Sequence, residues 1–199
     1  MLRIQILPLI FVLAVSFSGC GRAAEAARVD LAQMNVPYTE AAYIESARQG
    51  DTSTLTLFIK AGMNPEAKTY DGQSALLVAT LANQAGAVKL LLAKGAGPNA
   101  QDKHGGTALM TAAWRGNKEI IEALLANGAD INKQADNGMT ALMFAAWDGR
   151  LEISRVLLEK GADPGLKDKN GWTALMRADF KGHTETANIL RESQRHKER

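Results

Sequence analysis

The chain has 199 residues, 46% hydrophobic and 22% charged, which is typical of a globular protein of one or two domains. Its formal net charge is only +2, so no whole-molecule field would attract nucleic acid or an anionic membrane. The single cysteine, Cys20, excludes an intramolecular disulfide and a multi-cysteine metal site.

The N-terminal segment has the features of a signal peptide. Arg3 supplies a positive charge, and the apolar stretch 6–17 is too short to cross a bilayer core of about 30 Å as a helix. The run Phe17-Ser18-Gly19-Cys20 resembles the lipobox of bacterial lipoproteins, although Phe17 stands where leucine is usual. We therefore expect a signal peptide over residues 1–19 and a lipidated N-terminus and tether over residues 20–37, able to reach about 60 Å when extended.

The lipobox resemblance implies a location in the cell envelope. Cys20 would carry the lipid anchor and the rest of the chain would face the periplasm. The outer membrane is favoured because Gly21, and not aspartate, follows the cysteine. Two other interpretations stay open, a conventional secretory signal with an incidental cysteine and a buried N-terminal apolar helix. If no signal is present, the protein would be a cytoplasmic scaffold.

From about residue 39 the sequence repeats itself every 33 residues without an insertion, which is typical of a solenoid. Each unit contains a glycine, a serine or threonine two residues later, a buried-type leucine and a second glycine. These columns are Gly72, Gly105, Gly138 and Gly171; Ser74, Thr107, Thr140 and Thr173; Leu91, Leu124, Leu157 and Leu190; and Gly95, Gly128 and Gly161.

Each unit predicts two short antiparallel helices. The hydroxyl column, for example Thr107, is suited to cap the first helix, which then ends at a glycine such as Gly116. Residues 117–127 predict a second helix with one apolar face, ended by Gly128, and 136–138 are turn-formers. Because two short helices cannot bury their apolar faces alone, each unit must stack on its neighbours.

The pattern GxTALMxAAWxGxxEIxxxLLxxGADxN resembles the ankyrin repeat. The resemblance implies an all-α solenoid of about five helix-turn-helix units with β-turn fingers over residues 38–199. Alanine replaces the usual proline at the first helical position, and leucine or methionine replaces the usual histidine, so apolar contact replaces that histidine's hydrogen bonds. The repeats are expected at about 39–71, 72–104, 105–137, 138–170 and 171–199.

The two ends depart from the pattern. In the first unit Thr39 and Ala41 replace the glycine and threonine columns, and in the last unit Gln194 replaces the terminal glycine. The polar tail 191–199 is expected to keep the open end of the solenoid soluble. A basic interaction tail is the alternative.

No catalytic constellation is evident. The histidines His104, His183 and His196 suggest neither a nucleophile and base pair nor a metal cluster. The acidic residues on successive turn tips are expected to be turn-formers: Asp102, Asp136 and Asp168. We expect no enzyme activity, no cofactor and no metal, with an unrecognised catalytic site as the remote alternative.

Aromatic residues stand at a repeat position that ankyrin repeats expose on their concave side. Trp114, Trp147 and Phe180 would form a ladder with a spacing of roughly 8–10 Å. Tryptophan and arginine are common in binding hot spots, although these rings could instead pack between repeats for stability. The candidate protein-binding residues are Trp114, Arg115, Met139, Trp147, Asp148, Trp172, Phe180 and Lys181.

The resemblance implies a protein-protein interaction module whose partner it does not name. We expect a protein partner and a membrane contact through the lipid anchor, with no nucleic acid and no small-molecule substrate. The alternative is a protective or immunity-type inhibitor of a periplasmic toxin or stress enzyme, which should be encoded beside its target.

Overall fold

The computed structural model describes residues 19–197, so the expected signal peptide lies outside the described residues apart from Gly19, as does the side chain of Cys20. The described part contains eleven helices and no named strand, and none of these helices is both long and apolar enough to cross a membrane. Their bounds are α1 Gly19–Gln33, α2 Glu40–Gln49, α3 Thr52–Lys60, α4 Ala75–Leu81, α5 Ala85–Ala93, α6 Ala108–Arg115, α7 Lys118–Ala126, α8 Ala141–Trp147, α9 Leu151–Glu159, α10 Ala174–Phe180 and α11 Thr184–Lys197.

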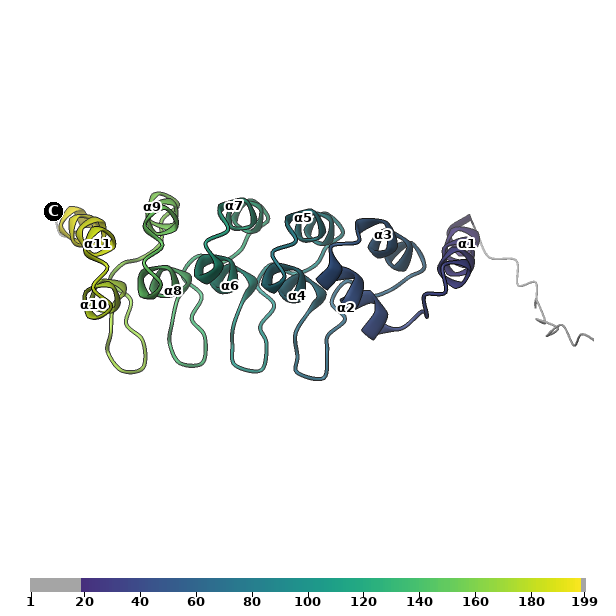
Figure 1. Ribbon diagram of the computed structural model, residues 1–199, viewed down its shortest axis with the longest axis horizontal. Coiled ribbons are helices and arrows are strands. Elements are labelled where there is room, and N and C mark those ends of the chain that lie inside the picture. Colours follow the sequence, from purple (N-terminus) through teal and green to yellow (C-terminus); the bar gives the residue numbers. More distant parts are fainter. Residues whose placement is uncertain (1–18, 198–199) are drawn as a thin grey trace, which may run out of the picture.

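The helices from α2 onward form five pairs that stack side by side (Figure 1). The first helix of each pair lies in one row and the second in another, which we call the inner and outer rows (Figure 1). We number the pairs as units 1 to 5, from α2–α3 to α10–α11. This arrangement confirms the expected all-helical solenoid with long turns between its units.

Capping residues define where the inner helices begin. The side chains of Ser74, Thr107, Thr140 and Thr173 each accept a hydrogen bond from the backbone N–H three residues on, as the sequence predicts. Unit 1 differs, because Ala41 has no hydroxyl at this position. Thr39 accepts from the Ala42 N–H instead, so α2 begins two residues earlier than the period predicts.

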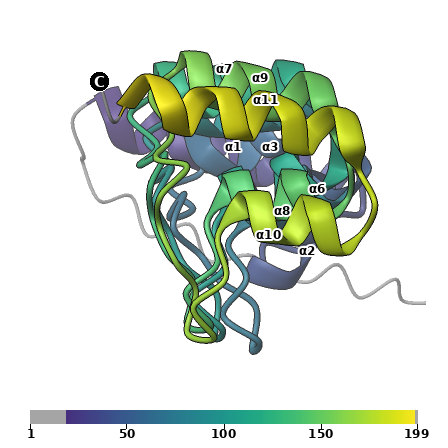
Figure 2. The same cartoon turned by 90° about the vertical axis from the view of Figure 1, so that its left-hand side faces the viewer.

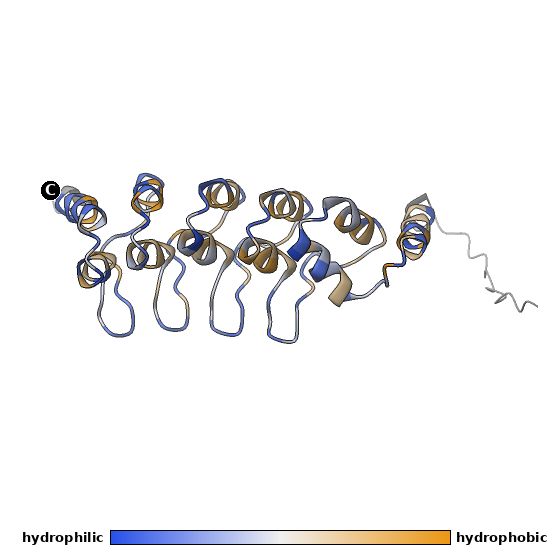
Figure 3. Ribbon diagram, viewed as in Figure 1, coloured by the Kyte–Doolittle hydropathy of each residue, from blue (hydrophilic) through white to orange (hydrophobic). Residues whose placement is uncertain are grey.

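The core runs continuously between the two rows, where apolar residues face one another (Figure 3). The leucine column of the outer helices is fully buried, which confirms the expected packing face: Leu91, Leu124, Leu157 and Leu190. The alanine column of the inner helices is also fully buried: Ala79, Ala112, Ala145 and Ala178. Small side chains let these backbones approach closely, while the leucines fill the space between units.

The segment 20–37 is not the extended tether expected from the sequence. Residues 19–33 form α1, which lies in the outer row beside α3 (Figure 1). Leu31 of α1 is fully buried, and Arg28 donates a hydrogen bond to the Ala61 carbonyl over 3.3 Å. The physical reason is that α3 has no preceding unit to cover it. The alanines, arginines and glutamate of this segment are good helix formers, so α1 serves as half a unit.

The last unit is adapted to an open end. Two repeat positions change from apolar to charged between units 4 and 5. Ala146 of unit 4 is replaced by Asp179 in unit 5, and Leu158 is replaced by Arg191. The side chains of Asp179 and Arg191 form an ion pair over 3.3 Å. With Gln194 in place of glycine, α11 continues for 14 residues. Both features agree with the expected polar end.

Candidate protein-binding groove

Four long turns, the fingers, project beside the inner helices on one side of the stack (Figure 2). We number them finger 1 to finger 4 and call the surface between them and the inner helices the groove; they comprise residues 64–73, 97–106, 130–139 and 163–172. Two hollows lie in it. One, of about 370 Å³, lies between units 1 and 2, and the other, of about 220 Å³, lies between units 3 and 4.

Backbone hydrogen bonds hold the fingers to one another. The N–H of Asp136 donates to the carbonyl of His104 over 3.0 Å, and the N–H of Lys169 donates to the carbonyl of Asn137 over 3.0 Å. An ion pair of 2.6 Å between Lys103 and Asp71 joins fingers 1 and 2. The fingers therefore form a continuous wall that presents side chains at defined positions.

Asp102 and Asp168 occupy the same place in two fingers. The Asp102 carboxylate accepts hydrogen bonds of 2.8 Å from the N–H groups of His104 and Gly106, which confirms its predicted role in the turn. Asp168 accepts from the N–H groups of Asn170 and Trp172 in the same way. The third residue of the predicted set, Asp136, contributes its backbone N–H instead.

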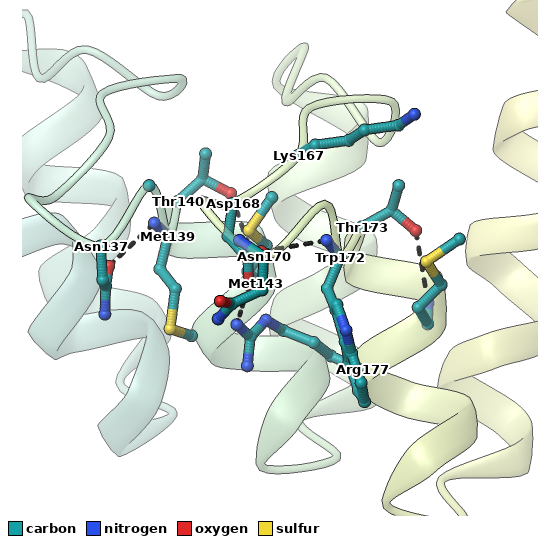
Figure 4. A network of polar contacts seen from close by, with 12 residues as sticks. Asn137, Met139, Thr140, Met143, Lys167, Asp168, Asn170, Trp172, Thr173 and Arg177 are labelled. Carbon is teal, nitrogen blue, oxygen red and sulfur yellow. Dashed lines mark hydrogen bonds and ion pairs between the residues drawn. The ribbon is translucent and has the colours of Figure 1, made fainter.

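Asp168 also forms an ion pair with Arg177 of α10, which the sequence did not suggest (Figure 4). Its side chain is completely buried. Burial acts to raise the pKa of Asp168. The hydrogen bonds from Trp172, Arg177 and Asn170, with the positive charge of Arg177, outweigh burial and hold this pKa below its ordinary value. One sequence feature could have indicated this ion pair. Arg177 is a long cation at the repeat position where unit 4 has Phe144.

The C-terminal part of the groove is an aromatic cluster crossed by cations. The rings of Trp147 and Phe180 stack with centroids 6.0 Å apart, and Trp172 meets Phe180 edge-on at 5.2 Å. The Arg177 guanidinium carbon lies 5.4 Å from the Trp147 ring centre, and the Lys181 ammonium lies 4.6 Å from it. We call Trp147, Trp172, Phe180, Arg177 and Lys181 the C-terminal aromatic cluster.

Trp114 stands apart from this cluster. Its side chain is 42% exposed, it lines the hollow between units 3 and 4, and Arg115 lies over its ring at 4.9 Å. Within residues 19–197, no ring contact joins Trp114 to Trp147. The expected ladder is thus one stacked pair and one separate tryptophan, because Trp147 is held toward α10 by Phe180 and the two cations.

Two other predicted site residues have different surroundings from those expected. Met139 is only 8% exposed and packs in the core, so the expectation that it faces a partner is wrong. A side chain one residue before the cap points inward when the next unit covers it, as unit 5 does here. Asp148 is half-buried and forms an ion pair of 2.6 Å with Arg150.

His183 joins two units. Its Nε2 lies 3.1 Å from the carbonyl oxygen of Trp147, at the end of the preceding inner helix. Gln84 and Arg150 occupy the same repeat position and donate to the carbonyls of Arg48 and Trp114. This column of donors was missed in the sequence because its members differ in type.

The family model described as ankyrin repeats (3 copies) matches the chain over residues 43–135 and 127–199. These two stretches together span all five helix pairs, beginning within α2. No curated protein matches the chain.

Proposed function

The chain belongs to the ankyrin-repeat family, and on this premise we propose that it is a non-enzymatic module that binds a protein partner in its groove. Ankyrin repeats imply protein partners, and the stacked units here provide a long, rigid surface for one. Rigid aromatic side chains on such a surface supply contact area at a small cost in conformational entropy.

The distribution of exposed apolar side chains supports this proposal. In the described part of the chain, no large exposed apolar residue lies on the outer helices α3, α5, α7, α9 or α11. Tyr70, Trp114, Met176 and Phe180 lie on a finger or on inner helices, while the others lie on α1 or next to it. Exposed apolar patches on one face usually mark an interaction site.

Site-specific photo-crosslinking tests the groove as a binding surface. A photoreactive amino acid in place of Trp114 should form a defined protein adduct in the producing cells. The matched control places the same amino acid at Glu122, which is exposed on the outer helix α7. Equal adduct yields from the two positions would contradict binding in the groove.

We further propose that the module is anchored in the bacterial cell envelope, facing the periplasm, with the outer membrane favoured. The support is the apolar stretch 6–17 followed directly by Ser18, Gly19 and Cys20. A lipid on Cys20 would sit at the first turn of α1, which is about 22 Å long at 1.5 Å per residue. Since α1 packs on α3, the groove would be held close to the bilayer and not at the end of a free tether.

Palmitate labelling tests the anchor. The chain should incorporate label and be shortened by cleavage before Cys20, whereas Cys20→Ala should do neither. Ser18→Ala is the matched control, because it keeps a small residue before the cleavage site and should still be labelled. Label in the Cys20→Ala variant would refute lipidation at this residue, and membrane fractionation would identify the membrane.

A further inference from the structure

The hollow between units 3 and 4 has a cause in the sequence of unit 3. Two repeat positions create it: Gly106, where unit 4 has Met139, and Thr111, where unit 4 has Phe144. In unit 4 Met139 is buried, and Arg177 of unit 5, at the repeat position of Phe144, extends to Asp168 (Figure 4). The hollow is therefore a property of this chain's unit 3 and not of the repeat.

Large apolar side chains form much of the wall of the hollow. Met110, Trp114 and Phe144 line it together with the fingers. Four polar residues also line it: Asp102, His104, Thr111 and Asn137. The Asp102 carboxylate already accepts two backbone N–H groups in its own turn, and the Asn137 side-chain oxygen accepts the N–H of Met139. At about 220 Å³ the hollow is smaller than the roughly 300–1,000 Å³ of typical small-molecule sites. One large apolar side chain suits it better than a small molecule.

The hollow between units 1 and 2 lacks this character. Its wall contains Glu40, Glu45, Arg48 and Lys68, and two of these charges, Glu45 and Arg48, form an ion pair of 3.1 Å. An apolar side chain entering there would have to desolvate charged groups, which costs free energy. The hollow between units 3 and 4 is thus the better anchor site.

Two cations at the C-terminal ends of the inner helices α6 and α10 form no ion pair within residues 19–197. Arg115 lies over the Trp114 ring, and Lys181 lies over the Trp147 ring. Two cations near them are neutralised, since Arg150 pairs with Asp148 and Arg177 pairs with Asp168. Carboxylates of a partner would pair with Arg115, in unit 3 on one side of the hollow, and with Lys181, in unit 5 on the other side.

We propose that the hollow between units 3 and 4 anchors one large apolar side chain from an acidic segment of a partner protein, whose carboxylates pair with Arg115 and Lys181. This inference rests on the proposed function of the groove. It adds the chemistry of the partner segment, which is an apolar side chain within an acidic stretch. It also adds the residues that would bind this segment.

A random peptide library displayed on phage and selected on the full chain is the probe. Selected peptides should share one aromatic or leucine residue flanked by aspartate or glutamate. Their affinity should fall at least tenfold in Thr111→Phe, which places the Phe144 side chain type in the hollow. Thr111→Ser, which leaves the hollow open, is the matched control and should bind as the parent does.

Charge reversal tests the same proposal without altering the hollow. The double variant Arg115→Glu, Lys181→Glu should weaken the selected peptides at least tenfold. The control Lys94→Glu, Lys160→Glu changes the net charge equally at the ends of outer helices α5 and α9, and should weaken them less than twofold. This second pair of variants keeps the proposal testable if Thr111→Phe folds poorly.

The outcomes separate this inference from the proposed function. Selected peptides that are basic, that lack a shared apolar residue, or that bind Thr111→Phe as tightly as the parent would overturn the anchor proposal. If such peptides still compete with the adduct formed at position 114, binding in the groove stands. If the photo-crosslinking also fails, the groove itself is not the binding surface and both proposals fall.

Discussion

At the scale of single residues, equal repeat positions carry different chemistry. Asp102 and Asp168 accept the same two backbone hydrogen bonds in their turns, yet only Asp168 has a guanidinium beside it. Arg177 in turn lies between Trp147 and Trp172, so the ion pair also positions the rings of the C-terminal aromatic cluster. The presence of arginine at position 177 thereby makes the turn of Asp168 part of a buried polar network.

Asp168→Asn should reveal the contribution of this pair. The amide keeps an oxygen for the two backbone N–H groups but loses the charge facing Arg177, so unfolding free energy at pH 7 should fall by about 2 kcal/mol. Asp102→Asn is the matched control and should lose less than half of that. Urea denaturation measures both, and equal losses would show that the guanidinium contributes nothing.

The free energy of unfolding of the same variant should depend on pH differently from that of the parent. The pKa of Asp168 is lowered in the folded state, so its stabilisation is fully present above the unfolded pKa of about 3.9. It is lost as pH falls through the lower folded pKa. The difference in unfolding free energy between the parent and Asp168→Asn should therefore become smaller as the pH is lowered from 7 to about 2. A difference that stays constant over this range would contradict the assignment.

Gly138 and Gly171 are a second matched pair. Both have a positive φ, of 82° and 80°. A Cβ at Gly138 would lie 2.7 Å from the Lys169 backbone nitrogen, whereas a Cβ at Gly171 would have no heavy atom within 4 Å. Gly171→Ala should cost about 1–2 kcal/mol for the left-handed backbone. Gly138→Ala should cost about 1–3 kcal/mol more, because finger 4 must move away. Thermal melts of the two variants measure the difference, and equal costs would argue against close finger contact.

At the scale of elements, the N-terminal helix changes the interpretation of the chain. A helix placed in the outer row beside α3 shields Leu55 and Phe58, both fully buried, from water. Tyr38 strengthens this end, because its ring stacks on Phe58 and its hydroxyl donates to the Ala61 carbonyl. The N-terminal end is therefore covered by apolar packing, and the C-terminal end by charged side chains.

Leu31→Ala should undock α1. Leu31 is fully buried, so its truncation should cost about 2–5 kcal/mol of packing and lower the hydrogen-exchange protection of the α1 amides at least tenfold. Val29→Ala on the same helix is the control. Val29 is 47% exposed, and its truncation should change stability by less than about 0.5 kcal/mol. If the two variants exchange alike, α1 behaves as the tether expected from the sequence.

At the scale of the whole molecule, the main contacts of each unit within residues 19–197 are with its neighbours. The inner helices contact one another in sequence, and the outer helices do so from α1 to α7 and from α9 to α11. Stability in such a stack is close to a sum of unit terms and interface terms, so central units are supported from two sides and the terminal unit from one. A core substitution in a central unit should therefore destabilise neighbours on both sides, whereas one in the terminal unit should destabilise mainly that unit.

Leu124 and Leu190 test this directly, because both are fully buried members of one column. Leu124→Ala should cost about 2–5 kcal/mol and lower hydrogen-exchange protection in units 2, 3 and 4. Leu190→Ala should lower protection mainly in α10 and α11. Loss of protection along the entire stack in both variants would mean that the solenoid unfolds as one unit.

The sequence by itself determined the repeat, the helix pairs, their caps and their buried columns. These features depend on contacts that recur at one spacing, and a recurring contact leaves a column of like residues, such as the Ser74 to Thr173 hydroxyls or the Leu91 to Leu190 leucines. The turn role of Asp102 was also accessible, because it involves only residues within four positions of it.

Only the tertiary structure decided the features that occur once. The docking of α1, the Asp168–Arg177 pair, the burial of Met139 and the hollow beside Trp114 each depend on which side chains meet across a joint between units. Such contacts leave no recognisable pattern in the sequence, because each combines unlike residues from two or three units. Whether a side chain in the groove packs or stays exposed is set by the size of its neighbour in the next unit, and that neighbour is known only once the units are stacked.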